Sequence, residues 1–471
     1  MPTVLWFRRD LRLTDHPALL AAVRDAADGE VVALFVADPR LIVAAGAPRL
    51  RRLTASLRAL DRALDGRLVI RLGATDAVVP AVVHEVGATA VHVTASTEPY
   101  GRRRDAAVEH ALDVPLVRTG SPYAVAPGRL RTRQGTPYTV FTPFRRAWLE
   151  HGWSAPAAPA PTVRWVQVRG DGWASLAGPD HDHRRADRQP SEPGADGGDP
   201  TEPAGERDAL ASWRRFAGGP LAEYAVDRDR PDREGTSRLS AALKLGEVHP
   251  RTLLADLAQA VAAVPELAPD AEVFTSQLAW REFHADVLWH RPEAAHSSLR
   301  AVVPDDAWAS GPHADAAFTA WSEGRTGYPL VDAGMRQLAT TGWMHNRVRM
   351  VTASFLVKDL HLDWRRGAAH FMAHLVDGDV AQNQLNWQWV AGTGFDAAPY
   401  FRVLNPVTQS QRFDPDGRYM HRWVPELRDV PAPAVHQPWT LGERAPAGYP
   451  APIVDHATER RATLEAYGRR G

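Results

Sequence analysis

Along the first 120 residues, short apolar runs rich in β-branched side chains alternate with segments whose leucines recur at helical spacing. The runs are TVLWF from residue 3, VVALFVAD at 31–38, RLVIRLG at 67–73, AVHVTAS at 90–96 and VPLVRTG at 114–120. APRLRRLTASLRALDRALD, between two of them, is typical of an amphipathic helix. Strands that alternate with such helices predict an α/β domain with a doubly wound parallel sheet over residues 1–130. No G-x-G-x-x-G follows a strand, so a dinucleotide fingerprint is not supported.

Residues 131–205 change in character and predict an interdomain linker. Their later part contains APAAPAPT and GPDHDHRRADRQPSEPGADGGDPTEPAGE, with almost no large apolar residue after Leu176. This composition buries too little surface to offset the entropy of ordering, so we expect residues 170–205 to be partly mobile. HDH at 181–183 suits a solvated polar loop better than a metal site, and no metal is expected. From residue 206 the pattern is helical, which predicts an all-α domain over 206–471.

Composition excludes several classes of protein. The net charge of −1 at pH 7 does not indicate a polyanionic partner. Absence of cysteine excludes disulfides, thiolate nucleophiles and cysteine-based metal sites. No apolar run is long enough to span a membrane and no signal peptide is recognisable, so we expect a cytoplasmic protein. Only Lys244 and Lys358 are lysine among 55 basic residues, and 11 of the 16 tryptophans follow residue 206.

The stretch FTSQLAWREFHADVLWH, at 274–290, has an unusual polar helical face. Gln277, Trp280, Arg281 and His284 share that face by their i, i+3, i+4 and i+7 spacing. A structural helix would normally bury aliphatic side chains there. The alternative is that Trp280 belongs to the core and the polar residues to the surface.

Two further segments offer polar groups at helical spacing. In GTSRLSAALKLG, at 235–246, the hydroxyls around Arg238 suit either an ordinary helix cap or a phosphate cradle at a helix start. In GWMHNRVRM, at 342–350, Asn346, Arg349 and Met350 fall on one helical face, and DGDVAQN follows from Asp377. Carboxylates, carboxamides and arginines together suit a large heterocycle that carries a pyrophosphate.

These motifs resemble the photolyase/cryptochrome family, and are closest to class I cyclobutane pyrimidine dimer photolyases. Six segments resemble the FAD domain of that family: GTSRLS, WREF, TGYPLVDAGMRQL, GWMHNRVRMVTASFLVKDLHLDW, DGDVAQNQLNWQW and FRVLNPVTQ. Two further segments, RRDLRLTDHPAL and EPYGRRRD, resemble its N-terminal antenna domain. The resemblance covers nearly the whole chain except residues 154–205, and it implies light-driven repair of DNA.

The resemblance implies a folded FAD in the helical domain. Its phosphates would be held by Tyr224, Thr236, Ser237, Arg238, Leu239 and Ser240. The flavin and its ribityl chain would be surrounded by Phe274, Gln277, Arg281, Asn346, Arg349, Asp377, Gly378, Asp379 and Asn383. Arg349 would pair with Asp377, and Asn383 would face flavin N5.

The tryptophans divide into two groups in this family. Trp387 matches the flavin-proximal member of an electron-transfer chain that continues through Trp364 to a surface residue, which we assign to Trp308. Trp280 and Trp389 would instead form walls of a cavity that receives the everted lesion. Extrusion of a base costs a few kcal/mol, least for damaged bases, and aromatic stacking returns roughly 1–3 kcal/mol per base. Two indoles therefore offset extrusion of a dimer but not of an intact pair.

UV-damaged DNA is the expected partner, with no obligate protein partner, no membrane and a monomeric enzyme. The resemblance implies DNA or lesion contacts from Arg228, Asn346, Arg347, Met350, Arg402 and Gln409, in addition to the two indoles. Because net charge is near zero, the DNA footprint must be local. The log–log salt slope should be about −0.9 per phosphate neutralised.

Gln277 departs from the resembled class, in which glutamate is usual at this position. Glutamine is more familiar in (6-4) photolyases, but those enzymes have histidine where this chain has Asn346. A carboxamide can donate a hydrogen bond but cannot transfer a proton. We therefore expect Gln277 to contact a cyclobutane dimer, with a (6-4) product as the alternative substrate.

Lys244 stands where deazaflavin-containing photolyases have a lysine that faces the antenna chromophore. This resemblance favours 8-hydroxy-5-deazaflavin over methenyltetrahydrofolate, with Arg49 and Glu98 as further candidates for contact. An ordinary surface lysine is the alternative. A cryptochrome photoreceptor is the rival function for the whole chain, but it predicts a C-terminal extension and erosion of Trp280 and Trp389. A flavin oxidoreductase that uses NAD(P)H would need a nucleotide fingerprint.

Overall fold

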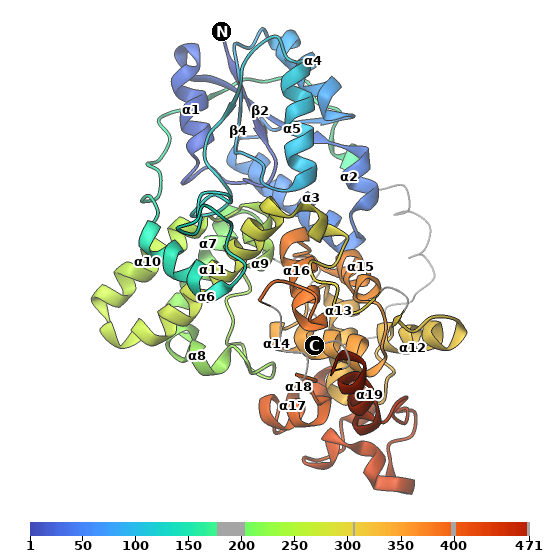
Figure 1. Cartoon of the computed structure of the whole chain (residues 1–471). Coiled ribbons are helices and arrows are strands. Elements are labelled where there is room, and N and C mark those ends of the chain that lie inside the picture. The colour runs from blue at the N-terminus through green and yellow to red at the C-terminus, as the bar shows by residue number, and fades with distance from the viewer. Residues whose placement is uncertain (177–202, 305–306, 397–401, 469–471) are drawn as a thin grey trace.

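The computed structural model describes residues 1–176, 203–304, 307–396 and 402–468 (Figure 1). The five predicted strands are present and parallel, and they pair in the order β3-β2-β1-β4-β5. Their bounds are Thr3–Phe7 for β1, Glu30–Ala37 for β2, Val69–Leu72 for β3, Val91–Val93 for β4 and Leu116–Arg118 for β5. The helices around them are α1 (Pro17–Asp25), α2 (Pro39–Ala44), α3 (Ala47–Ala63), α4 (Thr75–Val86) and α5 (Pro99–Ala111).

Successive side chains of β1 alternate between the two faces of the sheet. Leu5 and Phe7 belong to one core with residues of α1 and α3, whereas Val4 and Trp6 belong to another with residues of α4 and α5. Burial on both faces explains why the predicted runs are apolar without alternation. The α/β fold class of the first domain is therefore confirmed.

Part of the range predicted as a linker is instead folded against both domains. Helix α6 (Phe141–His151) buries Phe144 and Trp148, and strand β6 (Arg164–Trp165) pairs in parallel with β2. The proline-rich surroundings concealed a helix whose apolar residues do recur at helical spacing. HDH at 181–183 and most of the segment predicted to be mobile lie outside the described residues.

The second domain is helical, as predicted, and lies below the sheet domain in Figure 1. Its helices are α7 (Glu206–Ala217), α8 (Tyr224–Asp227), α9 (Ser240–Leu245), α10 (Pro250–Ala263), α11 (Ala268–His290), α12 (Pro312–Ser322), α13 (Pro329–Thr341), α14 (Asn346–Ser354), α15 (Trp364–His374), α16 (Val380–Ala391), α17 (Pro406–Phe413), α18 (Arg418–Trp423) and α19 (His456–Gly468). A π-helical turn, Phe355–Asp359, continues α14.

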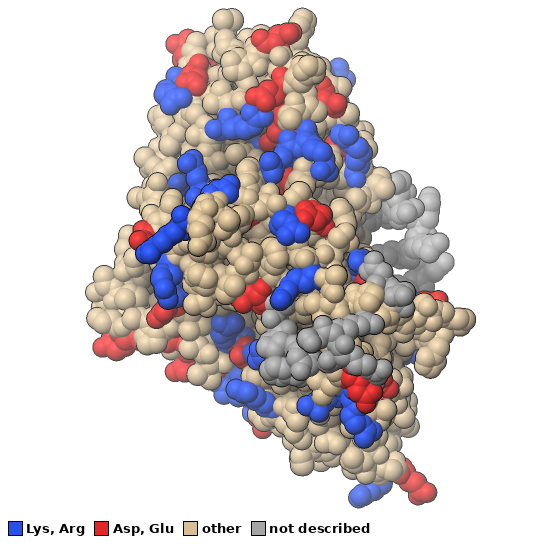
Figure 2. All heavy atoms as spheres, in the orientation of Figure 1, with Lys and Arg blue, Asp and Glu red and all other residues tan. Residues whose placement is uncertain are grey.

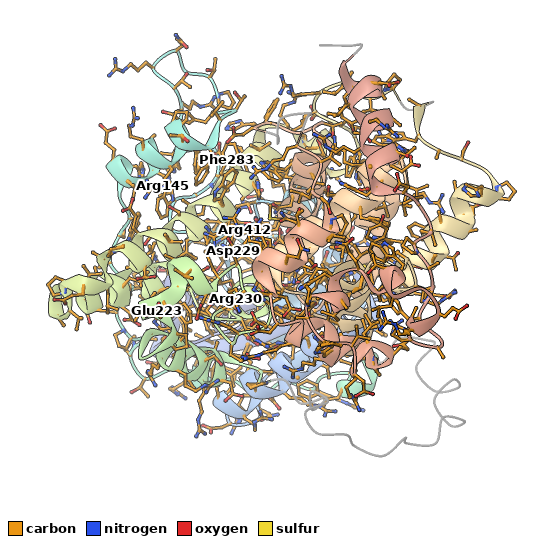
Figure 3. All side chains as sticks on the ribbon, turned by 90° about the horizontal axis from the view of Figure 1, so that it is seen from below. Arg145, Glu223, Asp229, Arg230, Phe283 and Arg412 are labelled. Atoms are coloured by element: carbon orange, nitrogen blue, oxygen red, sulfur yellow. The ribbon has the colours of Figure 1, made fainter. Side chains whose placement is uncertain are left out.

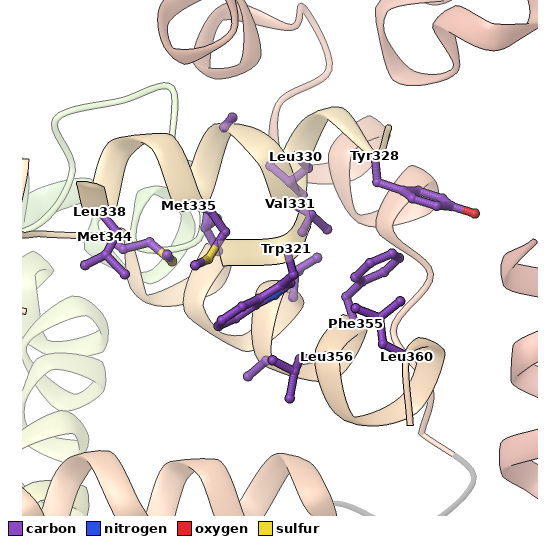
Figure 4. Packing of buried hydrophobic residues seen from close by; sticks show 14 of the residues in the cluster. Trp321, Tyr328, Leu330, Val331, Met335, Leu338, Met344, Phe355, Leu356 and Leu360 are labelled. Carbon is purple, nitrogen blue, oxygen red and sulfur yellow. The ribbon is translucent and has the colours of Figure 1, made fainter. Parts of the chain in front are cut away.

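Two apolar clusters organise these helices. One lies around Trp321, with Met335, Phe355 and Leu356 packed about it (Figure 4). The other joins α6, α7, α10 and α11. Helices α11, α14 and α15 each contact α16. Within the described ranges, no helix combines the length and apolar character needed to cross a bilayer.

Candidate active site

A cavity of about 540 Å³ lies among α8, α9, α11, α14, α15 and α16; we call it the first cavity. Segments that are distant in the sequence converge on it. The predicted site residues that line it are Tyr224, Arg228, Ser237, Leu239, Ser240, Phe274, Gln277, Trp280, Arg281, Asn346, Arg347, Arg349, Met350, Asp377, Gly378, Asp379, Asn383, Trp387, Trp389 and Arg402. Lys244, predicted as an antenna residue, also lines it.

Helix α11 forms one wall, and the face predicted from its spacing does point into the cavity. Trp280 is held from behind by a stack on Phe141 of α6, with ring centroids 3.7 Å apart and planes 10° from parallel. Arg281 donates to the backbone oxygens of Pro122 and Leu243. The alternative, in which only Trp280 is inside and the polar residues face solvent, is therefore wrong.

The opposite face of α11 is anchored by Glu282. Its carboxylate accepts hydrogen bonds from the backbone N–H groups of Ala124 and Val125 and from the indole of Trp148. Burial nevertheless raises the pKa of Glu282 to about 7. These bonds fix the helix that presents Trp280 to the cavity.

Helix α14 contributes a second wall, and it contains the expected ion pair. Arg349 binds Asp377 through two hydrogen bonds of 3.2 and 2.9 Å. The pair is therefore bidentate, and the side chain of Asp377 is only 3% exposed whereas that of Arg349 is 24% exposed. Asn346 and Met350 line the cavity from the same helix.

Helix α16 begins at the capping residue Asp379, which accepts from the backbone N–H of Gln382. Asn383 follows, and its Nδ2 donates to the backbone oxygen of Ala368 at 3.0 Å. This bond leaves the carboxamide oxygen as the part of Asn383 that can accept from a ligand. His284, which its spacing placed on the polar face of α11, also lines the cavity, and its Nδ1 donates to Gln382 Oε1 and so ties α11 to α16.

The three tryptophans assigned to electron transfer share one apolar cluster. Trp387 and Trp364 lie inside it and Trp308 lies at its edge. Trp387 packs against α15 at Gly367, where an added Cβ would lie 2.2 Å from the indole. Gly367 is one helical turn beyond Trp364 in α15. Trp387, although it belongs to α16, therefore contacts α15 within one turn of Trp364. Sequence reasoning missed Trp321, whose ring centroid is 6.2 Å from that of Trp387.

Among the residues predicted to contact FAD, DNA or the lesion, three do not line the first cavity: Thr236, Arg238 and Gln409. Arg238 has a left-handed φ of 51° and pairs with Glu234 on the surface. Helix α9 begins after Leu239 without a side-chain capping hydrogen bond. The ordinary cap is therefore wrong for this segment, and the hydroxyls of Ser237 and Ser240 remain available to the cavity.

A second cavity, of about 260 Å³, lies at the carboxyl ends of β1, β2 and β4 in the first domain. The strand order reverses between β1 and β4, and open parallel sheets bind ligands at such a switch point. Arg49, Glu98 and Lys244 all line it. Sequence reasoning missed the other charged lining residues, Arg8, Arg9, Asp10, Asp38 and Arg104.

Lys244 stands between the two cavities and lines both. Its Nζ lies 3.6 Å from a carboxylate oxygen of Glu98 and 3.6 Å from one of Asp379, and Arg9 also pairs with both acids. Burial alone would raise the pKa of Asp379, but Lys244 and Arg9 outweigh burial and hold it below its ordinary value. The surface-lysine alternative is wrong, because this side chain is 17% exposed.

Known proteins match both domains. Residues 3–162 match a family model described as DNA photolyase, and residues 274–469 match one described as the FAD binding domain of DNA photolyase. Two proteins named deoxyribodipyrimidine photo-lyase, from Streptomyces griseus and Escherichia coli, are 45% and 40% identical, and each match covers 98% of both chains.

Solved structures agree over the whole length. A class III photolyase from Agrobacterium tumefaciens superposes with a TM-score of 0.87 at 35% identity, covering 99% of this chain and 97% of that one. A Synechocystis cryptochrome gives 0.85 at 25% identity, covering 99% of each. The chain therefore belongs to the photolyase/cryptochrome family, within which it is a photolyase enzyme with an N-terminal photolyase domain and a C-terminal FAD-binding domain.

Proposed function

We propose that the protein splits cyclobutane pyrimidine dimers in UV-damaged DNA by light-driven electron transfer. The observation that carries the proposal is that Trp280 and Trp389, from two different helices, line the same cavity. Relatives named deoxyribodipyrimidine photo-lyase support it over nearly their full length. A dimer everted between two indoles regains by stacking what its extrusion costs, whereas an intact base pair does not.

The inner wall of the first cavity suits FAD by its chemistry. Hydroxyls of Ser237 and Ser240 can donate to a pyrophosphate, and Asn383 can accept from a ring N–H because its own N–H is already bound. The Arg349–Asp377 pair provides a fixed polar edge. When bound and reduced, FAD supplies the electron that light transfers to the lesion. Trp387, Trp364 and Trp308 would form the route by which electrons reach this cavity from the surface.

The second cavity suits an acidic, planar antenna chromophore. Its lining combines apolar Phe35 and Leu53 with Arg49, whose Nη1 is buried and finds no hydrogen-bond partner among the described residues. Lys244 adds a second cation at the wall shared with the first cavity. Such cations suit either anionic chromophore, and the resemblance at Lys244 favours 8-hydroxy-5-deazaflavin over methenyltetrahydrofolate.

Repair of defined oligonucleotides tests this function. One oligonucleotide contains a cyclobutane dimer and another a (6-4) product, and each is incubated with reduced holoenzyme under blue light and in the dark. We expect light-dependent repair of the dimer alone. Repair of only the (6-4) product would overturn the assignment of the cyclobutane dimer as substrate. Gln277 is the residue that would explain such a preference. Repair of neither would favour a photoreceptor.

A further inference from the structure

Asp229 lies just beyond α8, and its carboxylate contacts two arginines that line the first cavity. Its oxygens accept from Nε and Nη2 of Arg347 at 3.3 and 2.8 Å. Nε of Arg228 lies 4.0 Å from Oδ1, the same oxygen that accepts from Arg347 Nε. One anion therefore serves two cations at the mouth of the cavity, and Figure 3 labels it in the view from below.

Arg347 is the more firmly held of the two arginines, because it donates two hydrogen bonds to Asp229. Arg347 also lies over the ring of Phe413, with 4.4 Å between its Cζ and the ring centroid, so it is held from two sides. Arg228 donates from Nη2 to Gln277 Oε1 at 3.3 Å. Asp229 thus connects the segment after α8 to α14 and, through Arg228, to a carboxamide on α11 that lines the cavity.

The neighbouring aspartates have other partners. Asp227 pairs with Arg233 and Asp232 pairs with Arg230, each at 2.7 Å. Among the described residues, Asp229 is the one of these three acids that contacts arginines lining the first cavity. Its side chain is 27% exposed, so a polar replacement of the same size should not disturb the fold.

We propose that Asp229 is a positioning residue that sets the preference for damaged over undamaged DNA. The inference rests on the function proposed above. Its negative charge weakens the attraction of any duplex phosphate to the rim. Its ion pairs also hold Arg228, Arg347 and the carboxamide of Gln277 in one arrangement. Only an everted lesion uses that arrangement, because an undamaged duplex binds through its phosphates alone.

Asp229→Asn tests the proposal. Dissociation constants are measured for matched oligonucleotides with and without a dimer, over a series of salt concentrations. We expect tighter binding of undamaged DNA, with a log–log salt slope steeper by about 0.9. The ratio of the two constants should fall roughly threefold to tenfold.

Two further variants separate position from charge. Asp227→Asn removes the same charge two residues away and should leave the ratio as in the wild type. Asp229→Glu keeps the charge and should keep the wild-type salt slope. An equal ratio in Asp229→Asn and Asp227→Asn would overturn the inference, as would a steeper slope in Asp229→Glu. If the wild type itself showed no preference for the dimer, the proposed function would fail instead.

Discussion

The two cavities of this molecule are built on different physical principles. The first lies among helices brought together from residues 224–402 and is lined by indoles, carboxamides, hydroxyls and an ion pair. The second lies at the carboxyl ends of β1, β2 and β4 of a parallel sheet and is lined in part by residues that follow these strands. On the face in Figure 2, arginines and acids are interspersed and form no single basic field, in keeping with the net charge of −1.

The difference predicts how each cavity responds to substitution. The first depends on polar groups that are buried and paired with partners far away in the sequence, so removal of one partner leaves another uncompensated. The second depends on strand order, which many apolar contacts maintain together, and its charged lining residues share partners, because Arg9 and Lys244 both pair with Glu98. Single substitutions should therefore be more damaging at the first cavity.

Arg349→Met should have the largest effect. Asp377 would remain in a buried position without its bidentate partner. Loss of one member of a buried pair costs about 3 kcal/mol. We expect a decrease of that size in the free energy of unfolding by chemical denaturation, with loss of flavin absorbance from the purified protein.

Arg40→Met is a control beside the second cavity, which is lined by Asp38 but not by Arg40 itself. Its partner Asp38 is 1% exposed, but Arg40 is 59% exposed and Tyr100 also donates to Asp38. Because solvent screens an exposed cation, the loss of stability should be much smaller than in Arg349→Met. Equal losses of unfolding free energy in the two variants would show that the two cavities tolerate substitution equally.

Trp389→Ala should weaken binding of a dimer-containing oligonucleotide by about 2 kcal/mol, or roughly thirtyfold. Binding of undamaged DNA should hardly change, because an unbroken duplex does not reach the indole. Trp343→Ala is a suitable control, since Trp343 lies beneath Arg238 and outside the cavity lining. A similar loss for both oligonucleotides would mean that Trp389 does not stack on the lesion. The dissociation constants can be measured by fluorescence anisotropy in the dark.

Lys244→Met should act on the second cavity while sparing repair. Removal of this cation should weaken binding of added 8-hydroxy-5-deazaflavin about tenfold, or about 1.4 kcal/mol, because a charge-assisted hydrogen bond is lost. Asp379 keeps Arg9 as a partner, so the start of α16 should remain in place. Titration of chromophore fluorescence measures the affinity, and repair under saturating light serves as the control. Unchanged affinity would mean that Lys244 does not contact the antenna chromophore.

Glu282 links α11 to the segment that leaves the sheet domain, and its titration should appear in the stability of the whole chain. Because burial raises its pKa to about 7, the folded state holds a proton that the unfolded state releases near pH 4.3. Stability should therefore fall as pH rises from about 4.3 to 7, by at most about 1.4 kcal/mol per pH unit. Glu282→Gln should flatten this pH dependence of the free energy of unfolding, measured by denaturant titration. An unaltered pH profile would mean that a group other than Glu282 binds the proton.

Local patterns were sufficient where one element holds the relevant groups. The spacing of Gln277, Trp280, Arg281 and His284 predicted the polar face of α11, and apolar runs predicted the five strands. The resemblance to photolyases added the Arg349–Asp377 pair, which no periodicity reveals because it joins separate segments.

Contacts between segments that are distant in the chain could not be predicted from local sequence patterns. The stack of Phe141 on Trp280 joins residues in a range predicted as a linker to the active-site wall. The pair of Asp229 with Arg347 spans 118 positions and leaves no local signal. The outward turn of Arg238 depends on one left-handed φ angle inside a motif that otherwise faces the cavity.

Gln277→Glu should have the smallest effect, and its direction tests how the rim and the first cavity cooperate. Arg228 already donates to Gln277 Oε1, and a carboxylate at that atom would accept the same bond with more strength. The substitution exchanges the NH₂ donor of the carboxamide for an acid that can donate only when protonated. Because Arg228 favours the ionised form, we expect the number of dimers split per absorbed photon to stay within about threefold of the wild type. Complete loss of repair would mean that the NH₂ of Gln277, and not its bond to Arg228, is what the lesion requires.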